Sequence, residues 1–390
     1  MIPVEQALAH LFALAAPLPP REIPLAQAAG RVLARPVAAR RTQPPFAASA
    51  MDGYALCAAD ARPGAVLRVV GVSAAGHGFD GALAPGQAVR ILTGAPVPQG
   101  ADRVVIQEDV TRQDDTITLG DRLDTGTNIR PVGADFCAGD TLSAPRRLGP
   151  ADLALAAAMN LPTLPVHRQA EVAIIATGDE LVMPGEDPGP DQIIAANGYG
   201  LKAMVEAEGA RARLLPIARD TEASLKTVFD LAEGADLILT IGGASVGDHD
   251  IVGPVAAALG MAKSFYKVAM RPGKPLMAGR MGPAVMIGLP GNPVSALVCG
   301  QVFVLPTLRV MHGLPAAPAS RLHGVLATDL PANGPREHYL RARITPDGLA
   351  PFDRQDSALL SVLSQARALI VRPPGDAPRR AGDSVDYLPL

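Results

Sequence analysis

The chain has 390 residues, with 35 lysine and arginine residues against 38 aspartate and glutamate residues and a formal net charge of −3. This near balance gives no sequence-wide cationic field, which argues against a protein that binds nucleic acid or a membrane surface. Hydrophobic residues make up 48%, which excludes a wholly disordered chain. The length predicts two or three domains, and the 39 glycines and 38 prolines predict many loops.

The three cysteines, Cys57, Cys137 and Cys299, are widely spaced and form no CxxC or Cys/His cluster. Neither a disulfide framework nor a structural zinc site is therefore predicted, and we expect a soluble, cytoplasmic protein. Residues 281–308 carry no charge, but prolines interrupt this run. A buried strand, a loop and a buried helix are predicted there, and not a membrane span.

The first part of the chain predicts helices followed by strands. Val4, Leu8, Leu11 and Phe12 share one face of an amphipathic N-terminal helix, and a second helix is predicted around Leu25–Leu33. Short β-rich runs separated by turn signals extend from about residue 53 to 142. Residues 150–160 predict another helix.

From residue 171 strands and helices alternate. Strands are predicted over 171–177, 212–218, 236–241 and 284–289. The helices between them are predicted to run from Asn197 as its cap, from Thr221, after Asp250, and from Asn292-Pro293. This alternation predicts a doubly wound parallel α/β sheet covered by helices. From residue 320 the pattern returns to β and predicts a small C-terminal barrel.

Four segments are therefore predicted. Residues 1–45 with 138–170 form a mixed helical segment, 46–137 a β-rich domain, 171–318 the α/β domain and 319–390 the C-terminal β-barrel.

Ligands of open α/β sheets bind beyond the carboxyl ends of the strands. The loops that leave the predicted strands are Thr177–Glu180, the turn that ends in Asp220, Gly242–Asp250 and Gly288–Ser295. The glycine-rich loop Gly242–Asp250 could cradle an anion, although it matches neither GxGxxG nor GxxxxGK[ST]. A tight strand-to-helix turn explains the same glycines equally well.

Acidic and basic groups are both predicted at this edge. The carboxylates are Asp179, Glu180, Asp220, Asp248 and Asp250. They would suit Mg²⁺ with a substrate phosphate, while helix capping and solvated loop charge are the alternative. Lys267, Arg271 and Lys274 lie in a Pro-Gly-rich segment that could clamp an oxyanion or simply form an exposed basic loop. Together these groups favour Mg²⁺-assisted chemistry at a phosphate or phosphoanhydride.

The polar residues of the β-rich part do not indicate a function by their sequence pattern alone. Asp52, Thr93 and Asp135 lie in turn-like segments of the β-rich part, which predict no catalytic role. No Ser/His/Asp triad or histidine metal motif is legible in the sequence.

Seven motifs in order carry a family resemblance: PPFxxSAMDGYA, RILTGAPVPxGADxVV, NIRPVGxDFxxGD, IIATGDEL, GGASVGDHD, YKVAMRPGKP and GLPGNPVS. The chain closely resembles the molybdopterin molybdenumtransferases, the MoeA-type family that includes the E domain of gephyrin. The resemblance spans nearly the whole chain.

This resemblance implies a molybdenum insertase of molybdenum cofactor biosynthesis. Adenylyl-molybdopterin would be cleaved in a Mg²⁺- and molybdate-dependent step, AMP released, and molybdenum placed on the dithiolene. The family forms an elongated homodimer of four-domain subunits, in which the mixed helical segment serves dimerisation. Its active cleft lies between the α/β domain of one subunit and the β-domain of the other. Molybdopterin adenylyltransferase and acceptor apo-enzymes are the implied partners.

The family's roles carry over by matched position. Asp52, Thr93 and Asp135 would face the cleft from the β-domain, and Glu180, Asp220 and Asp250 from the α/β domain. Asp220 and Asp250 would hold Mg²⁺ or its waters, and Lys267, Arg271 and Lys274 would engage phosphate or molybdate. Implied substrate-binding residues are Thr177, Gly178, Gly242, Gly243, Ser245, Gly247, Pro290, Gly291, Asn292, Pro293 and Ser295. Arg341, Ser357 and Ser361 would form an oxyanion site.

The sequence departs from the family pattern at several positions, and two alternative functions stay open. Ala244 replaces a common valine, and RQDSALLS replaces a more Gly/His-rich stretch around Ser357. Ala47-Ala48 replaces a frequent Asp-Asn, and Arg271 stands where lysine is common. One alternative is the adenylyltransferase, which resembles only the α/β part of this chain. The other is a gephyrin-like scaffold, although gephyrin's extra linker and fused adenylylating domain are missing.

Overall fold

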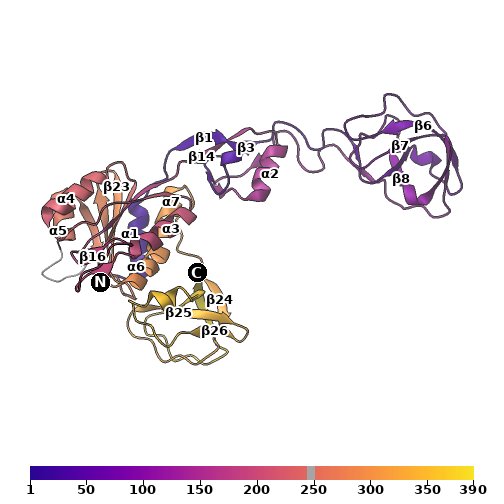
Figure 1. The fold of residues 1–390 in the computed structure, drawn as a ribbon. Helices are drawn as coiled ribbons and strands as arrows, with labels where there is room; N and C mark the ends of the chain where they lie inside the picture. The colour runs from indigo at the N-terminus through magenta and orange to yellow at the C-terminus, as the bar shows by residue number, and fades with distance from the viewer. Residues whose placement is uncertain (244–250) are drawn as a thin grey trace.

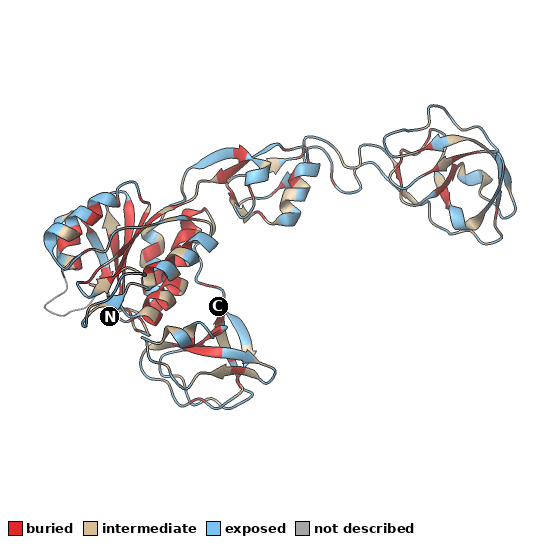
Figure 2. Ribbon diagram, in the orientation of Figure 1, coloured by how far each residue is buried: buried red, intermediate tan, exposed pale blue. Residues whose placement is uncertain are grey.

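The computed structural model describes residues 1–243 and 251–390. The molecule is elongated: an α/β body with the C-terminal barrel beside it occupies one end, a small β-rich unit follows, and a β-domain occupies the other end (Figure 1). Buried residues line the strands and the inward faces of the helices in the α/β body (Figure 2).

The sheet of the α/β body runs in the order β18–β15–β19–β23–β22–β20. Its strands are β18 (Arg211–Leu214), β15 (Glu171–Ala176), β19 (Leu237–Ile241), β23 (Ala284–Leu289), β22 (Met277–Met281) and β20 (Ala262–Tyr266). The first four are parallel, as the alternation of strands and helices predicts. The other two pair antiparallel, contrary to a wholly parallel sheet. Since only Gly282 and Pro283 join β22 to β23, the chain has no room for a crossover.

Helices cover both faces of this sheet. Val172 and Ile174 of β15 pack in one cluster with α1, α3, α6 and α7, whereas Ala173 and Ile175 pack in another with α4 and α5. The helices are α1 (Val4–Leu14), α3 (Asn197–Ala207), α4 (Glu222–Leu231), α5 (Val252–Ala258), α6 (Pro293–Cys299) and α7 (Leu305–Met311), with a π-helical turn over Gly300–Val304. The doubly wound α/β core is thus confirmed.

The N-terminal helix α1 belongs to this body. Its buried residues Val4, Leu8 and Leu11 join the cluster that contains Phe303 and Leu308. Grouping all of residues 1–45 with 138–170 is therefore wrong for this helix, because its apolar face is buried against the α/β body. The helix predicted at Leu25–Leu33 is also wrong: the chain forms a 3₁₀ turn over Leu25–Gln27 and then strand β2 (Val32–Leu33). Pairing of β2 with β14 and β13 outweighs the local helical pattern.

The small unit between body and β-domain consists mainly of strands. They are β1 (Pro20–Pro24), β14 (Thr163–His167), β2, β13 (Arg146–Arg147), β3 (Val37–Ala38) and β12 (Thr141–Leu142), with helix α2 (Pro150–Ala158) beside them. Glu208, at the end of α3, forms salt bridges with Arg147 of this unit and Arg309 of α7. The pair with Arg147 fastens the unit to the body, and the pair with Arg309 lies within the body.

The β-domain at the far end is a mixed sheet. Its strands follow the order β8 (Arg103–Ile106), β5 (Gly53–Leu56), β7 (Gln87–Ile91), β6 (Val66–Ser73), β10 (Thr116–Leu119) and β9 (Val110–Gln113), and the short strands β4 (Ala48–Ser49) and β11 (Ile129–Arg130) pair beside it. Tyr54, Leu56, Val105 and Ile117 form its core. The β-rich character predicted for this part is confirmed.

The C-terminal strands close into the predicted barrel. They are β24 (Leu322–Val325), β25 (Glu337–Thr345), β26 (Gly348–Pro351), β27 (Ala368–Arg372) and β28 (Ser384–Pro389), with the short helix α8 (Leu360–Leu363). A bridge between Leu326 and Leu349 completes the ring. The short strand β21 (Met270–Arg271) of the body pairs with β25 and so joins the barrel to the body.

Residues 293–311 are long and apolar enough to cross a membrane, but 83% of that stretch is buried inside the protein. This burial agrees with the predicted core helix.

Candidate functional site

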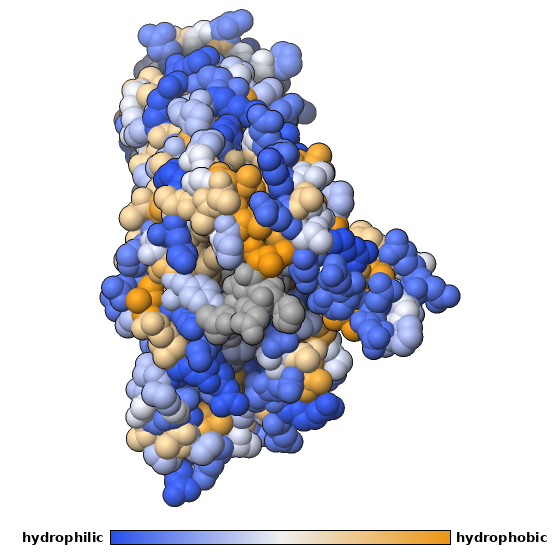
Figure 3. Space-filling model, turned by 90° about the vertical axis from the view of Figure 1, so that its left-hand side faces the viewer, coloured by the Kyte–Doolittle hydropathy of each residue, from blue (hydrophilic) through white to orange (hydrophobic). Residues whose placement is uncertain are grey.

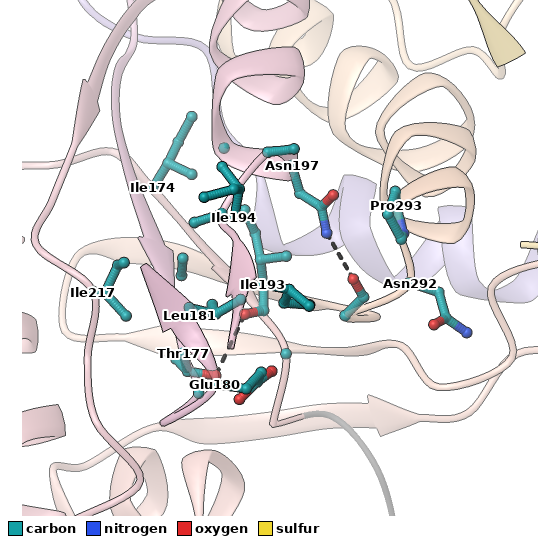
Figure 4. A pocket seen from close by; sticks show the side chains of 18 of the residues that line it. Ile174, Thr177, Glu180, Leu181, Ile193, Ile194, Asn197, Ile217, Asn292 and Pro293 are labelled. Carbon is teal, nitrogen blue, oxygen red and sulfur yellow. Dashed lines mark hydrogen bonds between the residues drawn. The ribbon is translucent and has the colours of Figure 1, made fainter. Parts of the chain in front are cut away.

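A pocket of about 840 Å³ lies at the carboxyl ends of three adjacent parallel strands. Thr177 and Gly178 follow β15, Gly242 and Gly243 follow β19, and residues 290–293 follow β23; all of them line the pocket. Figure 4 shows Thr177, Asn292 and Pro293 of these turns around the pocket. The site therefore lies where strand alternation predicts it.

Close packing of the strand ends explains the glycines Gly242 and Gly243. The amide of Gly242 donates to the carbonyl of Leu289 at 3.1 Å, and Thr177 donates its amide to the carbonyl of Ile241 at 2.9 Å. A Cβ atom on Gly242 would lie 2.8 Å from the carbonyl oxygen of Thr177, and its φ is +94°. Gly242 therefore lets the end of β19 approach the neighbouring strand ends closely, where a side chain would not fit. Ser245, Gly247, Asp248 and Asp250 lie outside the described residues.

Two exposed carboxylates, Glu180 and Asp220, line the acidic side of the pocket. The amide of Asp220 donates to Asp179 Oδ1 at 3.1 Å, which ties the two loops together. Arg219 Nη1 donates to the carbonyls of Asp179 and Leu181 at 3.0 Å. Sequence reasoning missed this positioning role of Arg219, because a lone arginine in a turn carries no distinguishing pattern.

The carboxylates of Glu180 and Asp220 are the candidate metal ligands among the residues that line the pocket. No group of three or more histidine, cysteine, aspartate or glutamate side chains comes together within the residues that the structure describes. Two carboxylates beside an open pocket nevertheless fit Mg²⁺, which takes one or two carboxylates and completes its octahedron with water and phosphate oxygens.

An apolar wall that sequence reasoning missed closes another side of the pocket. Strand β16 (Leu181–Val182) pairs in parallel with β17 (Ile193–Ile194), and Leu181, Ile193 and Ile194 line the pocket with Ile217 and Tyr199. Ile193 is 59% exposed. The isoleucine pair inside a Pro/Gly-rich polar loop was the available signal. Figure 3 shows apolar side chains gathered on an otherwise hydrophilic face at the α/β end of the molecule.

Asn197 has a role other than the predicted cap. It is the first residue of α3, whose N-cap is Ala196. Its side-chain Nδ2 donates to the carbonyl of Gly291 at 2.6 Å (Figure 4). Asn197 therefore ties α3 to the turn after β23.

The basic segment reaches the same edge of the sheet. Tyr266 at the end of β20 pairs with Met277, which pairs in turn with Gly288 of β23. Pro275 lines the pocket, whereas Lys267, Arg271 and Lys274, all within the described part of the chain, lie outside its walls. Lys267 has a φ of +69° and lies over the Tyr266 ring at 5.3 Å.

His338 lies on β25 directly beside Arg271 of β21. Burial, followed by the charges of Arg271 and Arg336, lowers the pKa of His338 to about 4. The imidazole is therefore neutral at pH 7, and the cationic character of this edge comes from arginine and lysine.

The β-domain candidates lie apart from this pocket within one chain, as the long separation in Figure 1 shows. Asp52 Oδ1 accepts hydrogen bonds from the amide and the hydroxyl of Thr93 at 2.6 and 2.7 Å. These bonds lower the pKa of Asp52 below its ordinary value. Asp135 is exposed and donates its amide to the carbonyl of Gln43. The structure thus joins Asp52 with Thr93 but brings neither to the pocket of its own chain.

The C-terminal candidates have mixed positions. Arg341 is 1% exposed and donates through Nε to Gln355 Oε1 at 3.2 Å. Ser357 is half-buried and its Oγ accepts from Asn292, whereas Ser361 is exposed. Ala358 and Leu360, which the sequence did not single out, line the pocket. Ser295 is buried in α6 and, within the described chain, is not part of the pocket wall.

Three family models match the chain. They are described as the MoeA N-terminal region (domain I and II) over residues 2–160, a probable molybdopterin binding domain over 173–310 and the MoeA C-terminal region (domain IV) over 323–390.

Curated relatives and a solved structure agree with these matches. The molybdopterin molybdenumtransferase of Nostoc sp. is 37% identical over 381 residues, which cover 93% of this chain and 86% of the relative. That of Haemophilus influenzae is 36% identical and covers 80% of this chain and 78% of its own. The crystal structure of a molybdopterin biosynthesis moeA protein from Pyrococcus horikoshii superposes with a TM-score of 0.87 at 26% identity, and covers 100% of both chains.

Proposed function

Because the chain belongs to the MoeA family of molybdopterin molybdenumtransferases, we propose that it inserts molybdenum during molybdenum cofactor biosynthesis. Its substrates are adenylyl-molybdopterin and molybdate. Water cleaves the phosphoanhydride, AMP leaves, and the dithiolene sulfurs take up molybdenum. The observation that carries the proposal is the pocket, which joins the carboxylates Glu180 and Asp220 to tight glycine turns at the ends of parallel strands.

The pocket walls suggest how the substrate is held. The turns after β15, β19 and β23 line the space for a phosphate-sized ligand, and the apolar wall of Ile193 and Ile194 accommodates its ring systems. Asp220, together with Asp250, would hold Mg²⁺, which would supply positive charge against the phosphates. Lys267, Arg271 and Lys274 at the rim attract molybdate and phosphate.

The remaining candidates support a composite site in a homodimer. Asp52, Thr93 and Asp135 are exposed and lie in parts of the chain away from its own pocket. Exposed Met51 and Leu92 directly precede Asp52 and Thr93, which is typical of a surface covered by another chain. We therefore propose that these residues complete the pocket of the partner subunit. We also propose that the protein acts in the cytoplasm. An adenylyltransferase would supply adenylyl-molybdopterin, and apo-enzymes would accept the finished cofactor.

Replacing Asp220 tests the proposal. Asp220→Ala removes a pocket carboxylate, so AMP release from adenylyl-molybdopterin with Mg²⁺ and molybdate should fall to background. Circular dichroism and sedimentation should stay unchanged, because Asp220 is exposed. Asp230→Ala, an exposed aspartate on α4 outside the pocket, is the matched control and should retain activity. Normal AMP release in Asp220→Ala would contradict the assignment.

The same assay separates the alternatives. An adenylyltransferase would instead consume ATP and molybdopterin. A scaffold would neither bind the pterin nor release AMP.

A further inference from the structure

The turn Gly291–Pro293, which forms one wall of the pocket, is held from two sides. On one side Asn197 donates to the carbonyl of Gly291 at 2.6 Å, a contact within the α/β body. On the other side Asn292 Nδ2 donates to Ser357 Oγ at 3.1 Å. Figure 4 shows the Asn292 side chain turned away from the apolar wall, opposite to Asn197. Since Ser357 belongs to the C-terminal barrel, this second contact joins two domains.

A backbone hydrogen bond reinforces the interdomain contact. The amide of Val294, in the first turn of α6, donates to the carbonyl of Ser357 at 3.0 Å. One of the free amides expected at this helix N-terminus is thus already used by the barrel. Ser357 therefore satisfies groups on both Asn292 and Val294.

The barrel holds Ser357 firmly in place. Gln355, two residues before it, accepts from the amide and from Nε of Arg341 at 3.1 and 3.2 Å, and donates to the Arg341 carbonyl at 2.9 Å. Arg341 Nη1 also donates to the carbonyl of Leu359. Because Arg341 is 1% exposed, the segment around Ser357 is anchored in the interior of the barrel. Ala358 and Leu360 of the same segment line the pocket.

We propose that Asn292 and Ser357 form an interdomain latch, through which the C-terminal barrel positions the Gly291–Pro293 turn against the ligand in the pocket. Ser357 is then a positioning residue and not a ligand of the oxyanion, and Arg341 supports it from inside the barrel. This inference rests on the proposed function only in taking an adenylyl-containing substrate as the ligand.

A double-mutant cycle measured with AMP as the probe tests the latch. Calorimetry on the full chain compares Ser357→Ala, Asn292→Ala and the double variant. Each single change removes one hydrogen bond worth about 1 kcal/mol, so AMP should bind about fivefold more weakly. If the two residues act only through their mutual hydrogen bond, the double variant should bind AMP no more weakly than the weaker-binding single variant does. Ser357→Thr keeps the hydroxyl and should restore binding. Ser364→Ala, which removes an exposed hydroxyl bonded within the barrel, is the matched control.

Independent effects of the two substitutions are the result that contradicts the latch. Independent effects that multiply to about 25-fold in the double variant would show that Ser357 contacts the ligand directly, and would overturn the latch.

Hydrogen exchange tests the latch without any ligand. In Asn292→Ala and in Ser357→Ala, amides of residues 353–360 and of Val294 should exchange faster, while those of Asn197 and its neighbours should not. Unchanged exchange in both variants would overturn the latch. If wild-type protein fails to bind AMP while exchange responds as expected, the proposed function fails and the latch stands.

Discussion

His312 illustrates how its surroundings determine the charge of a single side chain. It follows α7, is 5% exposed, and its Nε2 accepts a hydrogen bond from the amide of Ala170 at 3.3 Å. Burial, followed by the nearby charges of Arg147 and Arg31, lowers the pKa of His312 to about 4. The imidazole is therefore neutral in the folded protein at pH 6, where an unfolded histidine is largely protonated.

We expect stability to depend on pH through this residue. Because the folded pKa lies below the unfolded value, the contribution is complete above about pH 6.5 and is lost as pH falls toward 4. The loss is on the order of 3 kcal/mol. In His312→Gln this dependence should be absent, so the difference in unfolding free energy between wild type and variant should shrink across the window. Urea unfolding from pH 7 to 4 measures this, and parallel curves would contradict the prediction.

At the scale of elements, helix α1 shows how a segment far from a domain in sequence becomes part of its core. Its apolar face packs against α7 and the β20–β22 edge of the sheet, and Leu11 is completely buried. Arg280 of β22 also donates to the carbonyl of Leu14 at the end of α1. Helix α1 thus shields the antiparallel strands β20 and β22 from solvent.

Truncating Leu11 should weaken the α/β body. Leu11→Ala removes a fully buried side chain, so the free energy of unfolding should fall by about 3 kcal/mol. Leu231→Ala on α4 is the matched control, because Leu231 is 48% exposed, and should cost under about 1 kcal/mol. Chemical denaturation measures the loss of stability, and hydrogen exchange should locate that loss in residues 171–311. A loss confined to residues 20–170 would place α1 in the small β-rich unit instead.

At the scale of the whole molecule, distance separates the two groups of candidate residues. The pocket lies in the α/β body, whereas Asp52 and Thr93 lie in the β-domain at the other end of an elongated chain. An ion pair of Glu208 with Arg147 fastens the small unit to the body. This separation is the reason for the proposal that Asp52 acts at the pocket of a second copy of the chain.

Complementation between subunits tests this arrangement. Asp52→Ala and Asp220→Ala should each be inactive alone. After mixing, unfolding and reassembly in equal amounts, half of the dimers would carry both variants, each with one intact site, so about a quarter of wild-type activity should return. Recovery of AMP release is the readout. An inactive mixture that contains heterodimers would show that each site is built within one subunit.

Sequence reasoning located the pocket because the carboxyl ends of parallel strands meet at one sheet edge. Thr177, Glu180, Asp220 and Gly242 could be assigned to it from strand alternation alone. It missed the wall of Ile193 and Ile194, because two apolar residues in a polar loop resemble a stray hydrophobic pair until β17 pairs with β16. It also missed Arg219, whose carbonyl partners are decided by how two loops meet.

Local periodicity and turn chemistry predict the four parallel strands of the α/β body with the helices between them, the C-terminal barrel and the strand ends that form the site. Contacts between residues distant along the chain instead determine that α1 joins the body, that β22 and β20 run antiparallel, and that Ser357 faces Asn292. A local pattern states which face of an element must be buried, but not which other element buries it.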